Sequence, residues 1–456
     1  MIGLSHGELV EVLGAEHGAA CDAVFSGVTI DSRQDCGGKL FVAIKGDNFD
    51  GHRFVAAARE NGASIALVEQ RQDCDIAQVV VDDCKRAMGD LANYWRRQCD
   101  PQVVALTGSN GKTTVKEMLY QVLSREAPTL ATRGNFNNDI GLPLTLFELS
   151  PEHRFAVIEM GANHRGEIAR LAEIAEPDIV YINNVAPAHL AGFGSIQGVI
   201  EAKGEIYAYC GPQHKALFNV DERASDYWME QCAAETRLTC ALDRPADVSL
   251  DWRNDNETLR LAVSYAGETQ SCDLALIGEH NARNALAAIS LALLAGFDLS
   301  TACANLAGFS GVKGRLQMLA GPARSRIVDD SYNANPGSLA AGIRALCALE
   351  GRPWLALGDM AELGGEAAEM HRAAAADARE QGVERMFACG ELSCRASAEF
   401  GEAGHCFDDI DAMADAIRER IDADVNLLVK GSRSAGMERL VQLLSDNQAA
   451  ENANAV

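Results

Sequence analysis

The residues whose types and spacing most directly suggest chemistry form the stretch TGSNGKTT, Thr107 to Thr114. It follows an apolar run, Val103 to Leu106, that is typical of a buried strand, and it precedes apolar residues at helical spacing from Val115 to Leu123. Main-chain N–H groups of such a glycine-rich turn, together with the positive end of the helix, can hold phosphate oxygens. Lys112 can then reach the outer phosphates, and the Thr113 hydroxyl can bind magnesium. The stretch therefore predicts a nucleotide-binding site.

This turn is shorter than the usual phosphate-binding loop. In the common pattern the first glycine would stand at Leu106, whereas Gly108 lies three residues before Gly111. An ordinary Gly-Lys turn without chemistry is the competing interpretation. The agreement of strand, glycines, lysine, hydroxyl and helix favours the nucleotide site.

Three further residues could serve this site, although each has a plain structural alternative. Glu159 ends a predicted strand, and carboxyl ends of strands are where open α/β sheets place ligands. His189 follows another strand, but magnesium prefers oxygen ligands, so His189 alone would be a poor magnesium ligand. Lys203 lies in a helical pattern, where a lysine is ordinarily a solvated side chain.

Pairs of asparagines form a second kind of candidate. Asn137 and Asn138 lie in TRGNFNND, where such side chains either form turns or recognise a ligand. Asn281 and Asn284 lie in the first turn of an amphipathic helix predicted over residues 278–294. Two amides beside free main-chain donors suit a flat nitrogen-rich ring such as adenine, and a simple helix cap is the alternative.

Composition limits the class of protein. A chain of 456 residues is too long for one ordinary core, so two to four domains are expected. The net charge of −25 argues against nucleic acid and against anionic membranes as main partners, so an anionic substrate needs a locally positive pocket. The 14 cysteines are scattered without a C-x-x-C pair, and no signal peptide or membrane span is visible. A reduced cytoplasmic enzyme is expected.

The elements that must position these residues predict an α/β protein of three domains. Residues 1–84 form a small mixed α/β domain, and residues 85–314 a central P-loop ATPase-like domain with a parallel-rich sheet and a β-rich excursion over 243–276. Residues 315–456 alternate strand and helix, which predicts a Rossmann-like doubly wound sheet. The last ten residues are expected to form a frayed tail. Polar signatures end the strands of the third domain, in DDSYNANP, GDMAELG and KGSRS.

Together these motifs resemble the Mur ligase family, the ATP-dependent amino-acid ligases of peptidoglycan precursor synthesis. The resemblance is carried, in the family's order over nearly the whole chain, by TGSNGKTT, EMGANHRGEI, NNVAPAHL, EAKGEI, GEHNARNALAA, KGR and DDSYNANP. Within the family, DDSYNANP, GDMAELG and the N-terminal DSR to DGH passage are similar to members that add D-alanyl-D-alanine to a UDP-N-acetylmuramoyl-tripeptide. The DNPR motif of the diaminopimelate-adding members is absent.

The resemblance implies an order of chemistry. ATP phosphorylates the terminal carboxylate of the UDP-sugar tripeptide, the dipeptide amine attacks the acyl phosphate, and the tetrahedral intermediate collapses to amide and phosphate. A carboxylate is a poor electrophile and phosphate a good leaving group, so ATP must activate the acid. Catalysis is then mainly positioning and charge stabilisation.

The resemblance also implies roles for residues. Lys112, Glu159, His189 and Lys203 would be catalytic, and two magnesium ions would be held by Thr113, Glu159, His189 and a carbamylated Lys203. ATP would contact Thr107, Gly108, Ser109, Asn110, Gly111, Lys112, Thr113, Thr114, Asn281, Asn284, Arg315 and Asp330. The UDP-substrate would contact Ser32, Arg33, Lys45, Asn48, His52, Asn137 and Asn138. The dipeptide would meet Lys430, Ser432 and Arg433, with Asp359 and Glu362 nearby.

Other functions remain open at this point. The chain could be another ligase of the family, of the diaminopimelate-adding or folylpolyglutamate type. It could also be a P-loop kinase or hydrolase, or a nucleotide-dependent binding module without turnover. We expect a monomer whose domains close around ATP and the UDP-substrate. The third residue of the tripeptide, diaminopimelate or lysine, is left open.

Overall fold

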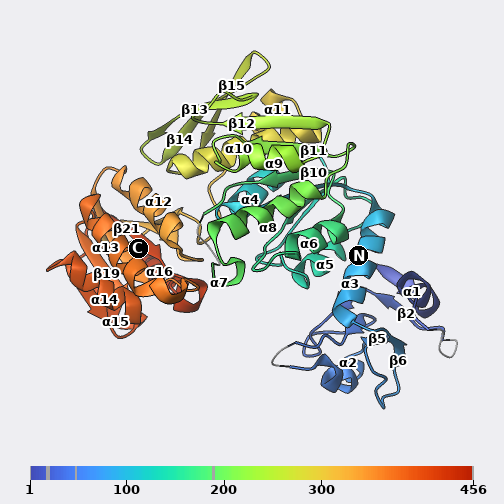
Figure 1. Ribbon diagram of the computed structural model, residues 1–456. Helices are drawn as coiled ribbons and strands as arrows, with labels where there is room; N and C mark the ends of the chain where they lie inside the picture. Colours follow the sequence, from blue (N-terminus) through green and yellow to red (C-terminus); the bar gives the residue numbers. More distant parts are fainter. Residues whose placement is uncertain (1, 17–20, 47–48, 187–189, 454–456) are drawn as a thin grey trace.

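The computed structural model describes residues 2–16, 21–46, 49–186 and 190–453 (Figure 1). Its N-terminal part contains a parallel sheet of order β3-β4-β5-β6 and an antiparallel pair β1-β2. These strands are β1 Gly3–Ser5, β2 Val24–Ser26, β3 Val28–Thr29, β4 Leu40–Val42, β5 Ile65–Val68 and β6 Ala77–Val80; the helices are α1 His6–Leu13, η1 Gly51–Phe54 and α2 Val55–Glu60. These elements confirm the small mixed α/β character that the sequence predicts for the N-terminal part.

A long helix, α3 (Cys84–Cys99), joins this part to the centre of the molecule. It begins where the Asp83 side chain accepts the main-chain N–H of Arg86. The buried Arg96 guanidinium donates to the main-chain oxygens of Ala175 and Glu176, at the end of a central helix. The helix therefore positions the N-terminal part through hydrogen bonds to the central part as well as through the chain.

The central part is built on a sheet of order β15-β14-β13-β12-β11-β10-β7-β9-β8, which is parallel from β8 to β13 and antiparallel from β13 to β15. The strands are β7 Gln102–Thr107, β8 Thr129–Ala131, β9 Phe155–Glu159, β10 Ile179–Ile182, β11 Lys215–Asn219, β12 Thr236–Ala241, β13 Val248–Asp255, β14 Thr258–Tyr265 and β15 Glu268–Leu274. The helices are α4 Lys112–Ser124, α5 Gly141–Leu146, α6 Glu167–Ala175, α7 Leu190–Phe193, α8 Ile196–Ala208, α9 Ser225–Gln231, α10 Glu279–Ala295 and α11 Leu299–Leu306. This sheet confirms the parallel-rich centre and the β-rich excursion.

Helix α10 differs from its prediction. An amphipathic helix is expected from the sequence, yet almost every residue from Asn281 to Leu294 is buried. Its apolar side chains share one core with those of α4 and with the inward face of β13 to β15. A helix that is covered on nearly all sides by its own protein needs no polar face, which a pattern of many alanines does not reveal.

The third part confirms the doubly wound sheet. Its order is β16-β17-β21-β18-β19-β20, parallel except for β16. The strands are β16 Gln317–Ala320, β17 Arg326–Asp330, β18 Arg352–Gly358, β19 Arg385–Cys389, β20 Gly404–Phe407 and β21 Val425–Lys430. The helices are η2 Pro322–Arg324, α12 Pro336–Cys347, η3 Gly364–Glu366, α13 Ala367–Glu380, α14 Glu391–Phe400, α15 Ile410–Arg418, η4 Arg433–Ala435 and α16 Glu438–Ala453.

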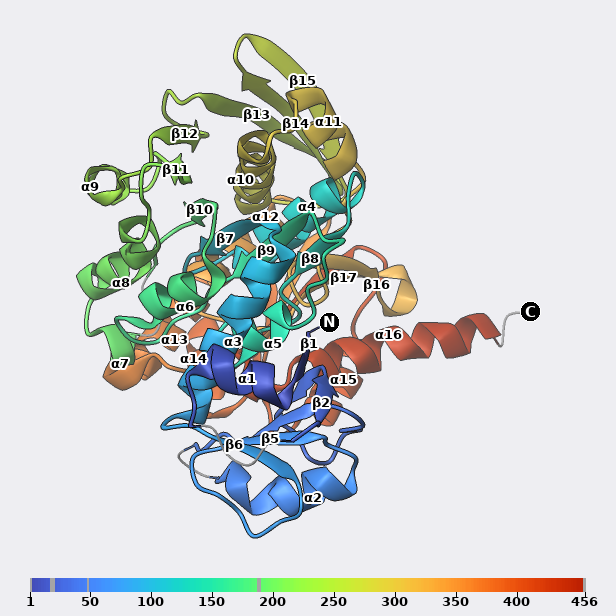
Figure 2. The same cartoon turned by 90° about the vertical axis from the view of Figure 1, so that its right-hand side faces the viewer.

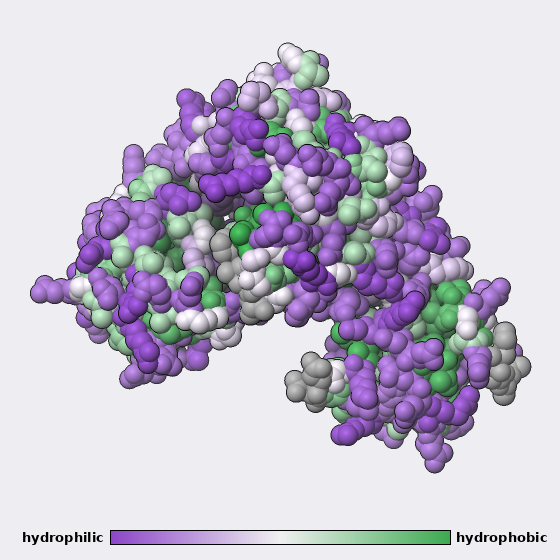
Figure 3. All heavy atoms as spheres, viewed as in Figure 1, coloured by the Kyte–Doolittle hydropathy of each residue, from purple (hydrophilic) through white to green (hydrophobic). Residues whose placement is uncertain are grey.

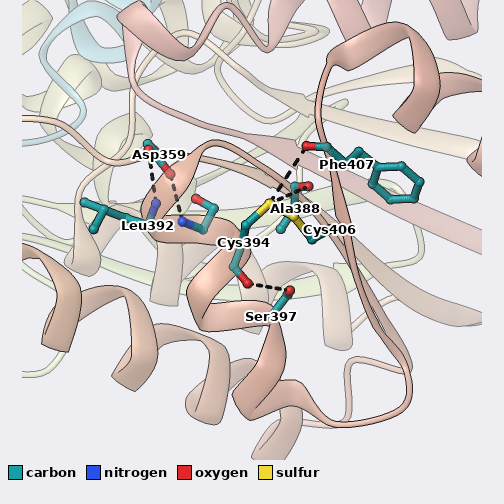
Figure 4. The surroundings of a disulfide bond; sticks show 8 residues. Asp359, Ala388, Leu392, Cys394, Ser397, Cys406 and Phe407 are labelled. Atoms are coloured by element: carbon teal, nitrogen blue, oxygen red, sulfur yellow. Dashed lines mark hydrogen bonds between the residues drawn. A yellow bond between two sulfur atoms is a disulfide. The ribbon is translucent and has the colours of Figure 1, made fainter.

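Three features of this part depart from expectation. The sequence analysis does not predict α14 or β20. Helix α16 continues to Ala453, where a frayed tail is expected, and it extends away from the body of the molecule (Figure 2). A disulfide joins Cys394 of α14 to Cys406 of β20, so the expectation of fully reduced cysteines is wrong at this pair (Figure 4).

The three parts form an arch with the central part at its top (Figure 1). The N-terminal and third parts sit at opposite ends of the central one, with open space between them and polar residues over most of the visible surface (Figure 3). Among the described residues, no helix is both long and apolar enough to cross a membrane. The domain limits after residues 84 and 314 stay predictions.

Candidate functional site

A cavity of about 920 Å³ opens at the carboxyl ends of the central strands β7, β9 and β10. Its lining comes from three places: the central part, the link at Arg315 and Leu316, and the third part. From the predicted site it includes Ser109, Asn110, Gly111, Lys112, Thr113, Thr114, Asn137, Asn138, Glu159, Lys203, Asn281, Asn284, Arg315, Asp330, Lys430 and Arg433. The fold therefore gathers residues more than 300 positions apart around one space.

The glycine-rich turn is packed against asparagine side chains. Gly111 has φ 77°, and a Cβ there would lie 2.5 Å from both the Asn183 amide nitrogen and the Asn284 amide oxygen. The side chains of Asn183 and Asn184 both donate to the main-chain oxygen of Asn110, at 2.9 and 3.0 Å. Only glycine can occupy position 111, because it meets both the positive φ and the close contact. The turn is thus held in shape by protein groups.

Two lysines meet at one main-chain oxygen. The ammonium groups of Lys112 and Lys203 donate to the Gly108 oxygen at 2.8 and 3.1 Å, and neither has an ion-pair partner in the described part of the chain. Burial lowers the pKa of Lys112, and the charge of Glu159 opposes that shift. Burial lowers the pKa of Lys203 well below its usual range, and the positive charge of Lys112 adds to the shift. Two buried lysine amines that share one neutral acceptor, with a carboxylate paired to neither among the described residues, leave this site ready for an anion.

Glu159 lies opposite the lysines with both carboxylate oxygens in use. Thr113 donates its hydroxyl to one oxygen at 2.9 Å, and the Asn137 amide donates to the other at 2.7 Å. The side chain is buried at the end of β9, where its main-chain N–H donates to the Thr132 hydroxyl at 3.0 Å. A carboxylate and a hydroxyl in contact are an oxygen pair of the kind that magnesium prefers.

The predicted adenine residues lie in the cavity lining with their amides largely engaged. Asn281 donates to the Ile277 main-chain oxygen at 2.9 Å, and Asn284 accepts from the Asn183 amide at 3.0 Å. Both are buried at the start of α10. Next to them, the imidazole of His280 has an Nε2 atom that is buried without a hydrogen-bond partner among the described residues. Burial lowers the pKa of His280 to about 4, so this ring is neutral at pH 7.

The third part contributes a stacked group of cations. The guanidinium of Arg315 lies 4.1 Å from the ring centre of Tyr332, and that of Arg433 lies 5.7 Å from it. Behind them, Lys430 and Asp330 form a buried ion pair, and Lys430 also donates to the Asn333 main-chain oxygen at 3.0 Å. Burial raises the pKa of Asp330, which Lys430 opposes. This side of the lining therefore carries the three basic residues Arg315, Lys430 and Arg433, although the chain as a whole is acidic.

Several predicted residues are placed elsewhere. Ser432, Asp359 and Glu362 are not among the described residues that line the cavity. Ser432 donates its N–H and its hydroxyl to the Asp359 main-chain oxygen, at 2.9 and 2.6 Å. The Asp359 carboxylate accepts from the main chain at the start of α14, as Figure 4 shows. Ser432 and Asp359 therefore connect the loops beside the cavity.

The predicted UDP-contacting residues of the N-terminal part lie apart from the cavity, whereas Asn137 and Asn138 line it. Ser32, Arg33, Lys45 and His52 belong to the N-terminal part, and none is among the described lining residues. Arg33 is paired with Asp31. The His52 ring contacts Asp50 at 2.7 Å and accepts the Glu69 N–H at 2.8 Å. Asn48 and His189 lie outside the described residues. Their contacts with a ligand stay predictions.

Thr107 precedes the phosphate-binding turn at the end of β7, and Thr114 follows it in the first turn of α4. Both are buried, and the Thr107 hydroxyl has no hydrogen-bond partner among the described residues. Ser109 is fixed by hydrogen bonds to Ala186, its hydroxyl donating to the main-chain oxygen and accepting from the N–H. These residues shape the turn from the strand side.

Sequence reasoning did not single out Asn183, Asn184 or Asn335 as site residues. Asn183 and Asn184 follow β10 directly, which was the available signal, because a neighbouring parallel strand ends at the same edge. Asn335 donates its amide to the Asn110 side chain at 2.8 Å, and so connects the third part to the phosphate-binding turn. That contact joins residues 225 positions apart and has no local signature.

Comparison with known proteins matches three family models along the chain. They are described as Mur ligase family, catalytic domain (residues 24–96), Mur ligase middle domain (residues 106–292) and Mur ligase, glutamate ligase domain (residues 314–433). The chain belongs to the Mur ligase family. The resemblance given by the sequence motifs is confirmed, and the cavity described above lies in the part of this Mur ligase that the middle and glutamate-ligase models cover.

Individual relatives and solved structures support the same family assignment. UDP-N-acetylmuramoyl-tripeptide–D-alanyl-D-alanine ligase of Escherichia coli K12 is 40% identical over 98% of this chain and 99% of its own, and that of Haemophilus influenzae is 37% identical over the same shares. Among solved structures, MurF from Acinetobacter baumannii has TM-score 0.90 at 33% identity, covering 98% of this chain and 99% of its own. MurF ligase from Thermotoga maritima in complex with ADP has TM-score 0.82 at 26% identity, covering 93% and 98%.

Proposed function

We propose that this Mur ligase uses ATP to join D-alanyl-D-alanine to UDP-N-acetylmuramoyl-tripeptide, forming the pentapeptide precursor of peptidoglycan. The observation that carries the proposal is that the phosphate-binding turn, Glu159, Lys203 and the basic residues of the third part line the same cavity. Full-length relatives at 40% and 37% identity bear the name of this ligase.

Different residues serve the successive steps of this reaction. Lys112 and the N–H groups of the turn hold the outer phosphates of ATP. Lys112 can do so because it donates only to the neutral Gly108 oxygen and its charge is not paired with a carboxylate among the described residues. The γ-phosphoryl group passes to the tripeptide carboxylate, and ADP leaves. The dipeptide amine attacks the acyl carbon, and phosphate leaves as the amide forms. The chain's own contribution is to place the three reactants and to offset their negative charge with Lys112, Arg315 and Lys430.

Magnesium fits the donor set on one side of the cavity. The Thr113 hydroxyl and Glu159 carboxylate would hold one ion, and His189 with a carbamylated Lys203 would hold another. Bound magnesium would neutralise charge on the phosphates. Lys203 suits carbamylation because its amine is buried with a lowered pKa. The nitrogen of its neutral amine would bond to the carbon of CO₂ and release one proton, which gives an anionic carbamate whose oxygen can bind metal.

The UDP-tripeptide and the dipeptide would bind toward opposite ends of the molecule. The UDP group would bind the N-terminal part through Ser32, Arg33, Lys45, Asn48 and His52, and the peptide would reach Asn137 and Asn138. The dipeptide would bind beside Lys430 and Arg433. This division agrees with a cavity lined by the central and third parts, since the N-terminal part would hold the remote end of a long substrate.

The test is an ADP-release assay with UDP-muramoyl tripeptides that carry diaminopimelate or lysine, with and without D-alanyl-D-alanine. We expect sustained ADP release only when tripeptide and dipeptide are both present, with one pentapeptide formed per ADP. A kinase or hydrolase would release ADP without the dipeptide. A member of the family with another acceptor would use a single amino acid in place of the dipeptide. A binding module would release none.

A further inference from the structure

The loop after β18, from Asp359 to Leu363, is held to the rest of the third part at several points. Its Asp359 main-chain oxygen accepts the N–H and the hydroxyl of Ser432. Its Asp359 carboxylate accepts the N–H groups of Leu392 and Ser393, at 3.3 and 2.8 Å, at the start of α14 (Figure 4). The loop therefore links three segments that the chain sequence keeps far apart.

The fit around Asp359 leaves little freedom. Gly390, which precedes α14, has φ 116°, and a Cβ at this glycine would lie 2.5 Å from a carboxylate oxygen of Asp359. A negative charge at the start of α14 is also favoured by the helix dipole. The Asp359 carboxylate is therefore committed to α14, while its main-chain oxygen is committed to Ser432.

His371 holds the same loop from behind. This residue of α13 is fully buried, and its ring lies between two main-chain groups. Nδ1 lies 2.7 Å from the Ala367 oxygen, and Nε2 lies 2.8 Å from the Met360 nitrogen. A carbonyl oxygen only accepts, so Nδ1 carries the proton, and Nε2 accepts the Met360 N–H. A neutral imidazole in this tautomer satisfies both contacts.

The held loop leads directly to the cavity. Ser432 is followed by Arg433, whose guanidinium lies over Tyr332 and lines the cavity. Ser432 is fixed by Asp359, and Asp359 precedes Met360, which His371 fixes. A shift of Met360 would thus be passed through one residue to Asp359, and from there to Ser432 and Arg433.

We propose that His371 is a positioning residue for the amine substrate: it fixes the Asp359–Met360 loop, and through Ser432 it sets the placement of Arg433 at the dipeptide end of the cavity. The inference rests on the proposed function, because it takes the dipeptide to bind beside Arg433. The imidazole is not among the described residues that line the cavity. It acts on dipeptide affinity through the loop, because its two hydrogen bonds go to Met360 and Ala367 and neither goes to the phosphate-binding turn or the N-terminal part.

Two isosteric replacements separate the two hydrogen bonds of the ring. In His371→Gln the side-chain oxygen can occupy the place of Nε2 and still accept the Met360 N–H. In His371→Asn the amide nitrogen can occupy the place of Nδ1 and donate to Ala367, which leaves the Met360 N–H without an acceptor. Both variants remove the imidazole and each keeps one of its two hydrogen bonds, so a difference between them reports which of the Met360 and Ala367 contacts the loop requires.

The experiment measures KM for each of the three substrates and kcat in both variants, with thermal unfolding as the check of folding. We expect H371N to raise the KM for D-alanyl-D-alanine about tenfold, with the KM values for ATP and UDP-tripeptide within about twofold of wild type. H371Q should keep all three within about twofold. The inference is overturned if H371N keeps the wild-type dipeptide KM, if both variants are equally impaired, or if all three KM values rise together.

A second pair covers the case in which H371N does not fold. Asp359→Asn keeps an oxygen acceptor for the Ser393 N–H, whereas Asp359→Ala removes it. We expect D359A to raise the dipeptide KM and D359N to stay closer to wild type; equal values would overturn the linkage. In the wild-type protein, amide hydrogen exchange should show Met360 protected, and rapid exchange there would contradict the His371 contact. If wild type fails to use the dipeptide at all, the proposed function fails, while the exchange result still tests the contact.

Discussion

At the scale of single residues, the most informative observation is the pair of lysines that share the Gly108 oxygen. A buried ammonium without a carboxylate partner is unfavourable, and the lowered pKa of Lys203 expresses that cost. If Lys203 became an anionic carbamate, the positive charge of Lys112 beside it would stabilise it. The local charge balance therefore favours a modified Lys203.

We expect Lys203→Ala to lose product formation by about 100-fold or more, because an anionic ligand for metal and phosphate charge is removed. Short-chain carboxylates should restore part of the activity, since they can place an anion in the vacated space. The rate of ADP formation against carboxylate concentration measures this. Lys39→Ala, in the N-terminal part, serves as the control and should show no response to carboxylate. Full activity of K203A without additive would contradict carbamylation.

The partly buried His280, whose Nε2 atom is fully buried, predicts a pH effect. Its folded pKa of about 4 lies below the ordinary value of 6.5, so the unfolded chain binds more protons between these limits. Stability from this neutral ring is present above pH 6.5 and is lost as pH falls toward 4, by at most about 1.4 kcal/mol per pH unit.

The measurement for His280 is the thermal midpoint of the free protein at pH 7 and pH 5, in wild type and in His280→Asn. We expect the wild-type midpoint to fall further than that of H280N, which has no imidazole to protonate. Equal falls would show that His280 does not resist protonation in the folded state.

How far the sequence predicts the site depends on the range of each contact. The turn from Thr107 to Thr114 and Glu159 are recognisable, because each follows a strand directly and carries a side chain of evident chemistry. Asn335 is not, since its role depends on a hydrogen bond to Asn110 across two parts of the molecule. His371 is also missed: a histidine on a helix gives no sign that it supports a loop.

At the scale of elements, alternation of strand and helix predicts the third sheet correctly but loses α14 and β20. Helix α14 mixes polar and apolar side chains, and β20 is only four residues long with no fully buried residue. Both are held by contacts that the local pattern does not show. These are the Asp359 carboxylate at the start of α14 and the disulfide between Cys394 and Cys406 (Figure 4).

The disulfide closes a short loop, with a sequence separation of 12. A cross-link of that size reduces the entropy of the unfolded chain, and about 3 kcal/mol is expected for a loop of this length. We therefore expect Cys406→Ser to lower the midpoint of the unfolding transition of the third part in non-reducing buffer. Reductant should lower the wild-type midpoint to the same level.

The control for the disulfide is Cys21→Ser, because Cys21 is an exposed free thiol. This change should leave the midpoint unaltered. Mass spectrometry after alkylation without reductant should find Cys394 and Cys406 unmodified. Alkylation of both, or a C406S midpoint equal to wild type, would contradict the cross-link.

At the scale of the whole molecule, the central and third parts already touch. Asn335 bonds to Asn110, and Arg326 pairs with Glu257 at 3.1 Å. The N-terminal part is held to the centre through α3, yet its predicted UDP residues lie apart from the cavity. A substrate that spans from the N-terminal part to the cavity would have to draw these regions together.

We therefore expect ATP and UDP-tripeptide together to reduce the radius of gyration, because the long substrate would contact both ends of its path. Small-angle X-ray scattering of the free and doubly loaded protein measures this. A Lys112→Ala variant, which should not hold ATP phosphates, provides the control and should not compact. An unchanged radius in the loaded wild-type protein would rule out closure.

The three larger sheets and their order along the chain follow from the sequence, because alternating patterns are local, whereas the β1-β2 pair does not. The placement of the parts does not follow, since it depends on a few polar contacts between surfaces, such as Arg326 with Glu257. The same reason explains why a cavity that joins residues 109 to 433 is visible only in the folded molecule.

The central claim is that a phosphoryl group passes from ATP to the tripeptide carboxylate in this cavity before the dipeptide amine attacks the acyl carbon. The most direct test uses UDP-tripeptide whose terminal carboxylate carries ¹⁸O, with ATP and D-alanyl-D-alanine, and follows the released phosphate by ³¹P NMR or mass spectrometry. The account predicts one ¹⁸O atom in each phosphate released and one retained in the new amide. Unlabelled phosphate, formed together with pentapeptide, would contradict it.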